Sequence, residues 1–144
     1  MIVAGVLLAL HLLGAAVWVG GMAFALLVLR PSLAVLEPPQ RLALHREVFR
    51  RFFRMVWHVM PLVLATGYAM IFAVYGGFAH LNWAINVMHL LGLVMTALFL
   101  YVVFVPWRAM RAAASAPAAE RIRRLVLVNL LLGAVTLIVA AWAG

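Results

Sequence analysis

Residues 11–22 read HLLGAAVWVGGM and lie within an apolar stretch that extends from residue 2 to residue 29. A helix needs roughly 20 apolar residues to cross a bilayer, so this stretch is long enough to span one. We expect the helix to end at Arg30 and Pro31, the first polar residue and the first proline after it. The stretch also contains His11. An ionisable side chain inside a membrane is costly, so His11 is a candidate functional residue.

The composition identifies the class of protein. Of the 144 residues, 69% are hydrophobic, which is typical of an integral membrane protein and leaves no room for a second domain. We therefore expect residues 1–144 to form a single transmembrane domain. The chain has no cysteine, which excludes disulfides, thiolate catalysis and cysteine-based metal sites.

Four apolar segments each suit a membrane-spanning helix, which predicts an all-α, up-down four-helix bundle: residues 2–29, 55–76, 83–107 and 125–143. All eleven basic residues are arginines, and they lie only in the connections 30–54 and 108–124. The positive-inside rule makes these two connections cytoplasmic and places both termini on the other side of a bacterial-type inner membrane. A net charge of +8 could suggest nucleic-acid binding in a soluble protein. Here the arginines are explained by the membrane topology, so we expect no nucleic-acid partner.

Two features of the arginine-rich connections predict local structure. Residues 40–53 suit an amphipathic helix that lies in the membrane interface and leads into the second span. Residues 112–119 are mostly alanine, which suggests a linker of small residues. Glycine and alanine faces on the spans would also allow homo-oligomers to form.

His11 and His89 are predicted to lie at similar depths. In the expected topology both helices run inward from the outer boundary, and the two histidines lie about 13 Å and about 9 Å below it. Two imidazoles at one level on facing helices could hold one metal centre, and histidine is a common axial ligand of haem. Gly14 and Gly92 flank the pair and would give a flat macrocycle room. Trp18, Asn86 and Asn129 could influence the reduction potential of the centre. The alternative is a purely structural hydrogen bond, for example between His89 and Asn129.

His58 is a further candidate metal ligand. It is expected near the cytoplasmic boundary, so its depth in the membrane differs too much from that of His11 and His89 for the three to share a centre. It could ligate a second haem, bind anions together with Arg50, Arg51 and Arg54, or lie at the interface without a ligand. The spans also contain six methionines, whose thioethers suit Cu(I) but are equally ordinary core residues: Met22, Met55, Met60, Met70, Met88 and Met95.

The stretch 11–22, followed by Leu29, Arg30 and Pro31, resembles the first helix of membrane proteins of the copper resistance protein D (CopD) type. The overall plan is also similar to that of HemJ-type protoporphyrinogen oxidases. The latter resemblance implies a haem b protein in which His11 is a ligand. Where that family has a lysine in its third helix this chain has His89, and it contains no lysine at all.

Three functions remain open from the sequence. The first is a small b-type cytochrome with bis-histidine ligation that exchanges electrons with quinone or a redox partner protein. The second is copper binding or copper transport by the same histidines. The third is an oxidase acting on protoporphyrinogen, which would make the protein a membrane oxidoreductase.

Overall fold

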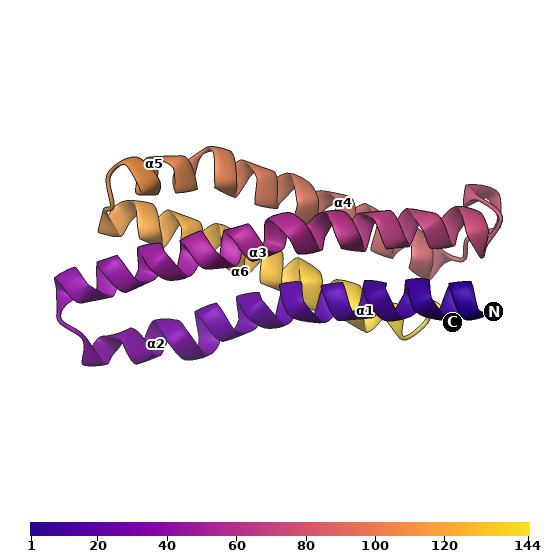
Figure 1. Ribbon diagram of the computed structural model, residues 1–144, viewed down its shortest axis with the longest axis horizontal. Helices are drawn as coiled ribbons and strands as arrows, with labels where there is room; N and C mark the ends of the chain where they lie inside the picture. The colour runs from indigo at the N-terminus through magenta and orange to yellow at the C-terminus, as the bar shows by residue number, and fades with distance from the viewer.

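The computed structural model describes all 144 residues, and every regular element in it is helical. Four long helical stretches lie along a common axis and alternate in direction, with both chain termini at one end (Figure 1). All four are long and apolar enough to cross a membrane. The prediction of an all-α, up-down membrane bundle is therefore confirmed. Its elements are α1 (Ile2–Ala23), η1 (Phe24–Leu29), α2 (Arg30–Ser32), η2 (Leu33–Val35), α3 (Pro38–Ala73), η3 (Phe78–His80), α4 (Trp83–Phe104), α5 (Pro106–Ala112) and α6 (Ala116–Ala140).

The first helical stretch continues past Arg30 and Pro31, so the expected end at these residues is wrong. It extends to Val35, and a π-helical segment, η1, precedes the proline. Proline lacks an N–H group, and its ring clashes with the carbonyl four residues earlier in an α-helix. The wider π-helical turn relieves this clash and lets the helix continue.

The arginine-rich connections are more helical than expected. Residues 40–53 are helical and lead into the second span as expected, and α3 runs without a break from Pro38 to Ala73. Its 36 residues measure about 54 Å, well beyond the roughly 30 Å hydrocarbon core of a bilayer. The alanine-rich linker is reduced to a short turn before α6, whose first turn is capped by the Ser115 hydroxyl accepting from the Ala118 N–H.

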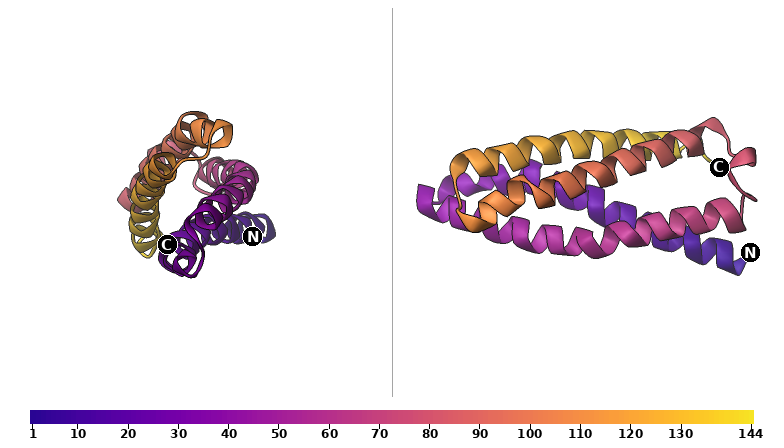
Figure 2. Two further views of the ribbon diagram at one scale, coloured as in Figure 1. Left: turned by 90° about the vertical axis from the view of Figure 1, so that its left-hand side faces the viewer. Right: turned by 90° about the horizontal axis from the view of Figure 1, so that it is seen from above.

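The helices form two closely packed pairs, α1 with α3 and α4 with α6 (Figure 2). The buried core lies between the pairs in the arginine-rich half. Trp18 meets Phe99 edge to face at 6.4 Å, and Phe53 meets Trp107 in the same way at 5.4 Å between ring centroids. Methionines fill the space between the rings, with Met22 and Met110 almost fully buried. Large side chains therefore hold the two pairs together at this end.

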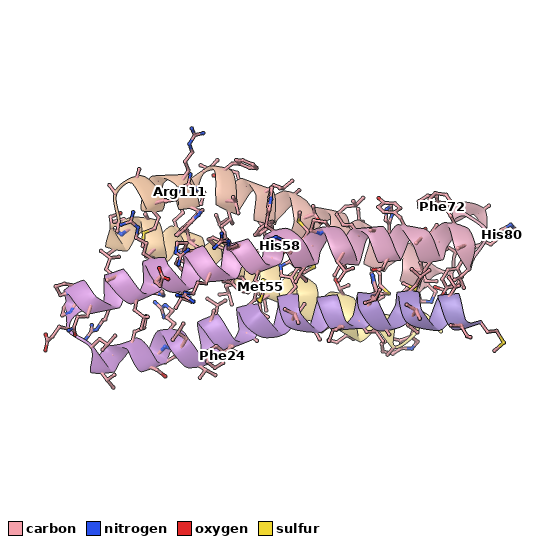
Figure 3. The ribbon with its side chains drawn as sticks, viewed as in Figure 1. Phe24, Met55, His58, Phe72, His80 and Arg111 are labelled. Atoms are coloured by element: carbon pink, nitrogen blue, oxygen red, sulfur yellow. The ribbon has the colours of Figure 1, made fainter.

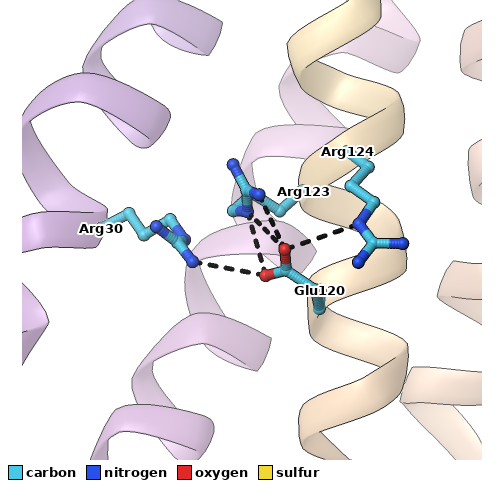
Figure 4. Close-up of polar contacts among 4 residues, drawn as sticks. All are labelled: Arg30, Glu120, Arg123 and Arg124. Atoms are coloured by element: carbon cyan, nitrogen blue, oxygen red, sulfur yellow. Dashed lines mark hydrogen bonds and ion pairs between the residues drawn. The ribbon is translucent and has the colours of Figure 1, made fainter.

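Glu120 links the first and last helical stretches (Figure 4). One of its carboxylate oxygens lies 3.3 Å from the Arg30 guanidinium of α2, and the other lies 2.7 Å and 3.7 Å from Arg123 and Arg124 of α6. Exposed ion pairs contribute little to stability individually. The cluster therefore adds little stability, but it shows that α2 and α6 are neighbours at the arginine-rich end.

Candidate functional site

His11 and His89 line one cavity. It lies between the two helix pairs, in the half of the bundle that carries the termini, and it has a volume of about 360 Å³. Of its 24 lining residues 17 are hydrophobic, so it is an apolar chamber with few polar groups. Trp18 and Gly92 line it as well. The structure thus brings together four of the seven residues that the sequence suggested for a cofactor site.

The His11 imidazole is held in a defined tautomer. Its Nδ1 lies 2.9 Å from the Val63 carbonyl oxygen and 3.1 Å from the Thr66 hydroxyl. A carbonyl can only accept, and the Thr66 hydroxyl donates its own proton to the Leu62 carbonyl at 2.7 Å. Nδ1 must therefore carry the proton. In the neutral ring this leaves the Nε2 lone pair available, which is how the partners of a metal-binding histidine usually orient it.

Gly67 makes room for this ring. A Cβ atom at residue 67 would lie 3.1 Å from His11 Cε1, closer than an ordinary contact. Val63, Thr66 and Gly67 lie on one face of α3, so one helix both orients His11 and leaves space for it. The spacing of these residues in the sequence gave no indication of this role, because it depends on α1 and α3 being adjacent.

His89 is paired with Tyr68. The Tyr68 hydroxyl lies 2.8 Å from His89 Nε2, and the two rings meet edge to face at 5.3 Å. The alternative pairing with Asn129 is not formed. Asn129 instead donates its Nδ2 proton to the Met95 carbonyl at 3.2 Å, and its Oδ1 is buried without a partner. A metal could reach His89 Nε2 only by replacing the Tyr68 hydrogen bond.

Besides Asn129, three other candidate residues lie outside the cavity. Gly14 packs against α3, where a Cβ would lie 2.7 Å from Val63 Cγ2. Asn86 donates to the carbonyls of Leu81 and Asn82 at the start of α4. His58 lies on an exposed face of α3, and its Nδ1 donates to the Arg54 carbonyl at 2.8 Å (Figure 3). None of the three contributes to a shared centre with His11 and His89.

Three methionines line the cavity beside the histidines: Met70, Met88 and Met95. No group of three or more histidine, cysteine, aspartate or glutamate side chains is gathered anywhere in the chain. The side chains that could bind a metal here are therefore two imidazoles, three thioethers and the hydroxyl groups of Tyr68, Tyr75 and Thr136. Such a set suits haem iron or Cu(I), and it does not suit hard cations such as Mg²⁺ or Ca²⁺ because the lining contains no carboxylate.

A family model described as copper resistance protein D matches residues 46–143, about two-thirds of the chain. The chain belongs to this family. It is accordingly a multi-pass inner-membrane protein related to copper resistance. The matched region contains His58, Tyr68 and His89 but begins after His11. No curated protein and no solved structure matches the chain.

Proposed function

We propose that this CopD-family protein binds haem b between α1 and α4, with His11 and His89 as axial ligands, and that it transfers electrons. One observation carries the proposal: histidines from two different helix pairs line the same apolar cavity. Bundle cores are common sites for such cofactors, and the ligands come from facing helices. Two histidine ligands would leave no open position on the iron, which favours electron transfer over oxygen binding.

The size and lining of the cavity support an organic cofactor. A bare ion needs little more room than a water molecule, which occupies roughly 30 Å³. The cavity volume of about 360 Å³ falls in the range of pockets that hold small organic molecules, roughly 300–1,000 Å³. Gly92 opens the α4 wall further, because a Cβ there would touch nothing within 4 Å.

The protein's own residues would prepare the site. Val63 and Thr66 hold the His11 ring with Nε2 free to bind, and Gly67 prevents a clash with that ring. His89 would exchange its hydrogen bond to Tyr68 for the iron. The apolar wall would limit access of water and thereby influence the reduction potential. Haem itself would supply one-electron redox chemistry.

Copper is the second candidate, and two observations favour it. The family description names copper resistance, and three methionine thioethers lie on the cavity wall near the histidines. Imidazole and thioether are suitable ligands for Cu(I). In this case His11 and His89 would bind the ion directly, without a porphyrin, for copper storage or transport.

Protoporphyrinogen oxidation remains the third hypothesis, from the HemJ-type resemblance alone. That activity would use the same cavity for a tetrapyrrole substrate. The histidine at residue 89 and the absence of lysine from the chain distinguish it from that family.

The visible spectrum tests the proposal. We expect the detergent-purified protein to show a sharp Soret band and, on reduction, low-spin α and β bands, with iron in the metal analysis. Gly92→Leu should place a side chain in the cavity and remove this signal, while the thermal unfolding of the variant stays close to that of the haem-free wild type. A colourless wild type that contains copper would favour the second candidate. A colourless, metal-free protein would refute both.

Tyr68→Phe should increase the affinity for the metal centre by about 3- to 10-fold. The variant keeps the aromatic packing against His89 but removes the hydrogen bond that competes for Nε2, and such a bond contributes about 0.5–1.5 kcal/mol. Titration of the apoprotein with haem, and separately with Cu(I), measures the change. A weaker affinity would instead mean that the Tyr68 hydroxyl supports the bound group.

A further inference from the structure

A second candidate site lies on α3, at the arginine-rich end and away from the cavity. Five residues line an open depression of about 450 Å³ on one face of the helix: Arg50, Arg51, Arg54, Met55 and His58. They recur at intervals of three and four residues, so successive helical turns bring them together. We refer to this surface as the arginine depression.

Its positive charge is only partly neutralised. Glu47 accepts from Arg50 at 2.6 Å and from Arg51 at 2.8 Å, and this carboxylate also holds both guanidinium groups in place. Arg54 makes no ion pair or side-chain hydrogen bond. Three arginines against one glutamate leave a local excess of two positive charges, and Arg54 is the cation with all its donors available.

The arginine depression lies at the expected edge of the bilayer. Arg54 is the last charged residue before the apolar part of α3, residues 55–73, in which His58 is the one ionisable imidazole. The His58 Nδ1 proton is donated to the Arg54 carbonyl, so the neutral ring presents only the Nε2 lone pair and the arginines supply the donors of this surface. Met55, 38% exposed, adds an apolar surface beside them. Cationic donors next to an exposed thioether match a phosphate with its acyl chain.

We propose that the arginine depression binds the head-group phosphate of an anionic phospholipid, with Arg54 as the main contact and Arg50 and Arg51 as supporting donors. Arginine suits phosphate because its planar guanidinium can donate two parallel hydrogen bonds. Basic surfaces beside membrane helices attract anionic lipids in the same way. The site is independent of any metal centre in the cavity.

Native mass spectrometry of the full chain in a neutral detergent tests this inference, using phosphatidylglycerol and phosphatidylcholine as probes. We expect phosphatidylglycerol to be retained in preference to phosphatidylcholine. Arg54→Gln should weaken its binding about fivefold. Arg111→Gln is the matched control, since it removes the same charge at the same end from a side chain that points away from the bundle (Figure 3).

Three results would overturn the proposal. Equal losses in both variants would indicate a general charge effect without a site. Equal retention of phosphatidylcholine would mean that the head-group charge is not recognised. Displacement of phosphatidylglycerol by millimolar inorganic phosphate would assign the depression to free anions. Unfolding of each variant, followed by circular dichroism, shows that any loss of lipid does not come from a loss of fold.

Discussion

His11→Ala should lower the affinity for the metal centre by at least 10- to 100-fold and abolish or change its low-spin spectrum. Loss of residues that merely orient a metal ligand already costs 10- to 100-fold in affinity, and His11 would be a ligand itself. His89→Ala, which removes the candidate ligand on α4, should have a similar effect. The measurement is haem or copper content per protein, together with the reduced-minus-oxidised spectrum.

His80→Ala is the matched control for this experiment. His80 lies in the connection between α3 and α4 at the end of the bundle (Figure 3), and it does not line the cavity. Its replacement should leave the spectrum unchanged. Identical spectra in all three variants would refute the two-histidine centre. Because His11→Ala also removes contacts to Val63 and Thr66, the unfolding of each variant must be compared before its metal content is interpreted.

Gly14→Leu should cause a large loss of stability. Even a Cβ at residue 14 would lie 2.7 Å from Val63 Cγ2 and 3.7 Å from Val59 Cγ1, on the stiff, β-branched side chains of α3. Small residues let membrane helices approach closely, and overpacking typically costs 1–3 kcal/mol and occasionally more. The expected result is a lower midpoint of unfolding in sodium dodecyl sulfate titrations.

Gly20→Leu on the same helix makes the same chemical change without the clash. A Cβ at residue 20 would meet no atom within 4 Å, and the residue is exposed to the surroundings of the bundle. Its unfolding midpoint should stay close to that of the wild type. If both variants were equally destabilised, the effect would come from replacing glycine in a helix and not from the contact between α1 and α3. Gly14→Leu should also displace His11, which lies one turn away, and so reduce metal binding.

The sequence by itself determined the class of fold. Four long apolar segments, with arginines confined to two connections, predict four membrane helices, because an unpaired backbone and isolated charges are both excluded from hydrocarbon. The position of His11 within the first segment and of His89 within the third made them candidate partners. The family assignment confirms the CopD resemblance, while the sidedness of the termini and the haem ligation stay predictions.

Tertiary structure decided the details of the site. Gly14 and Gly92 are indistinguishable in the sequence, yet one packs against Val63 and the other opens onto the cavity. Tyr68 became the partner of His89, and Val63 and Thr66 fixed the His11 tautomer. Each of these contacts joins different helices. Hydropathy reports only whether a segment enters the membrane, whereas the rotation and pairing of helices there depend on close packing and a few hydrogen bonds.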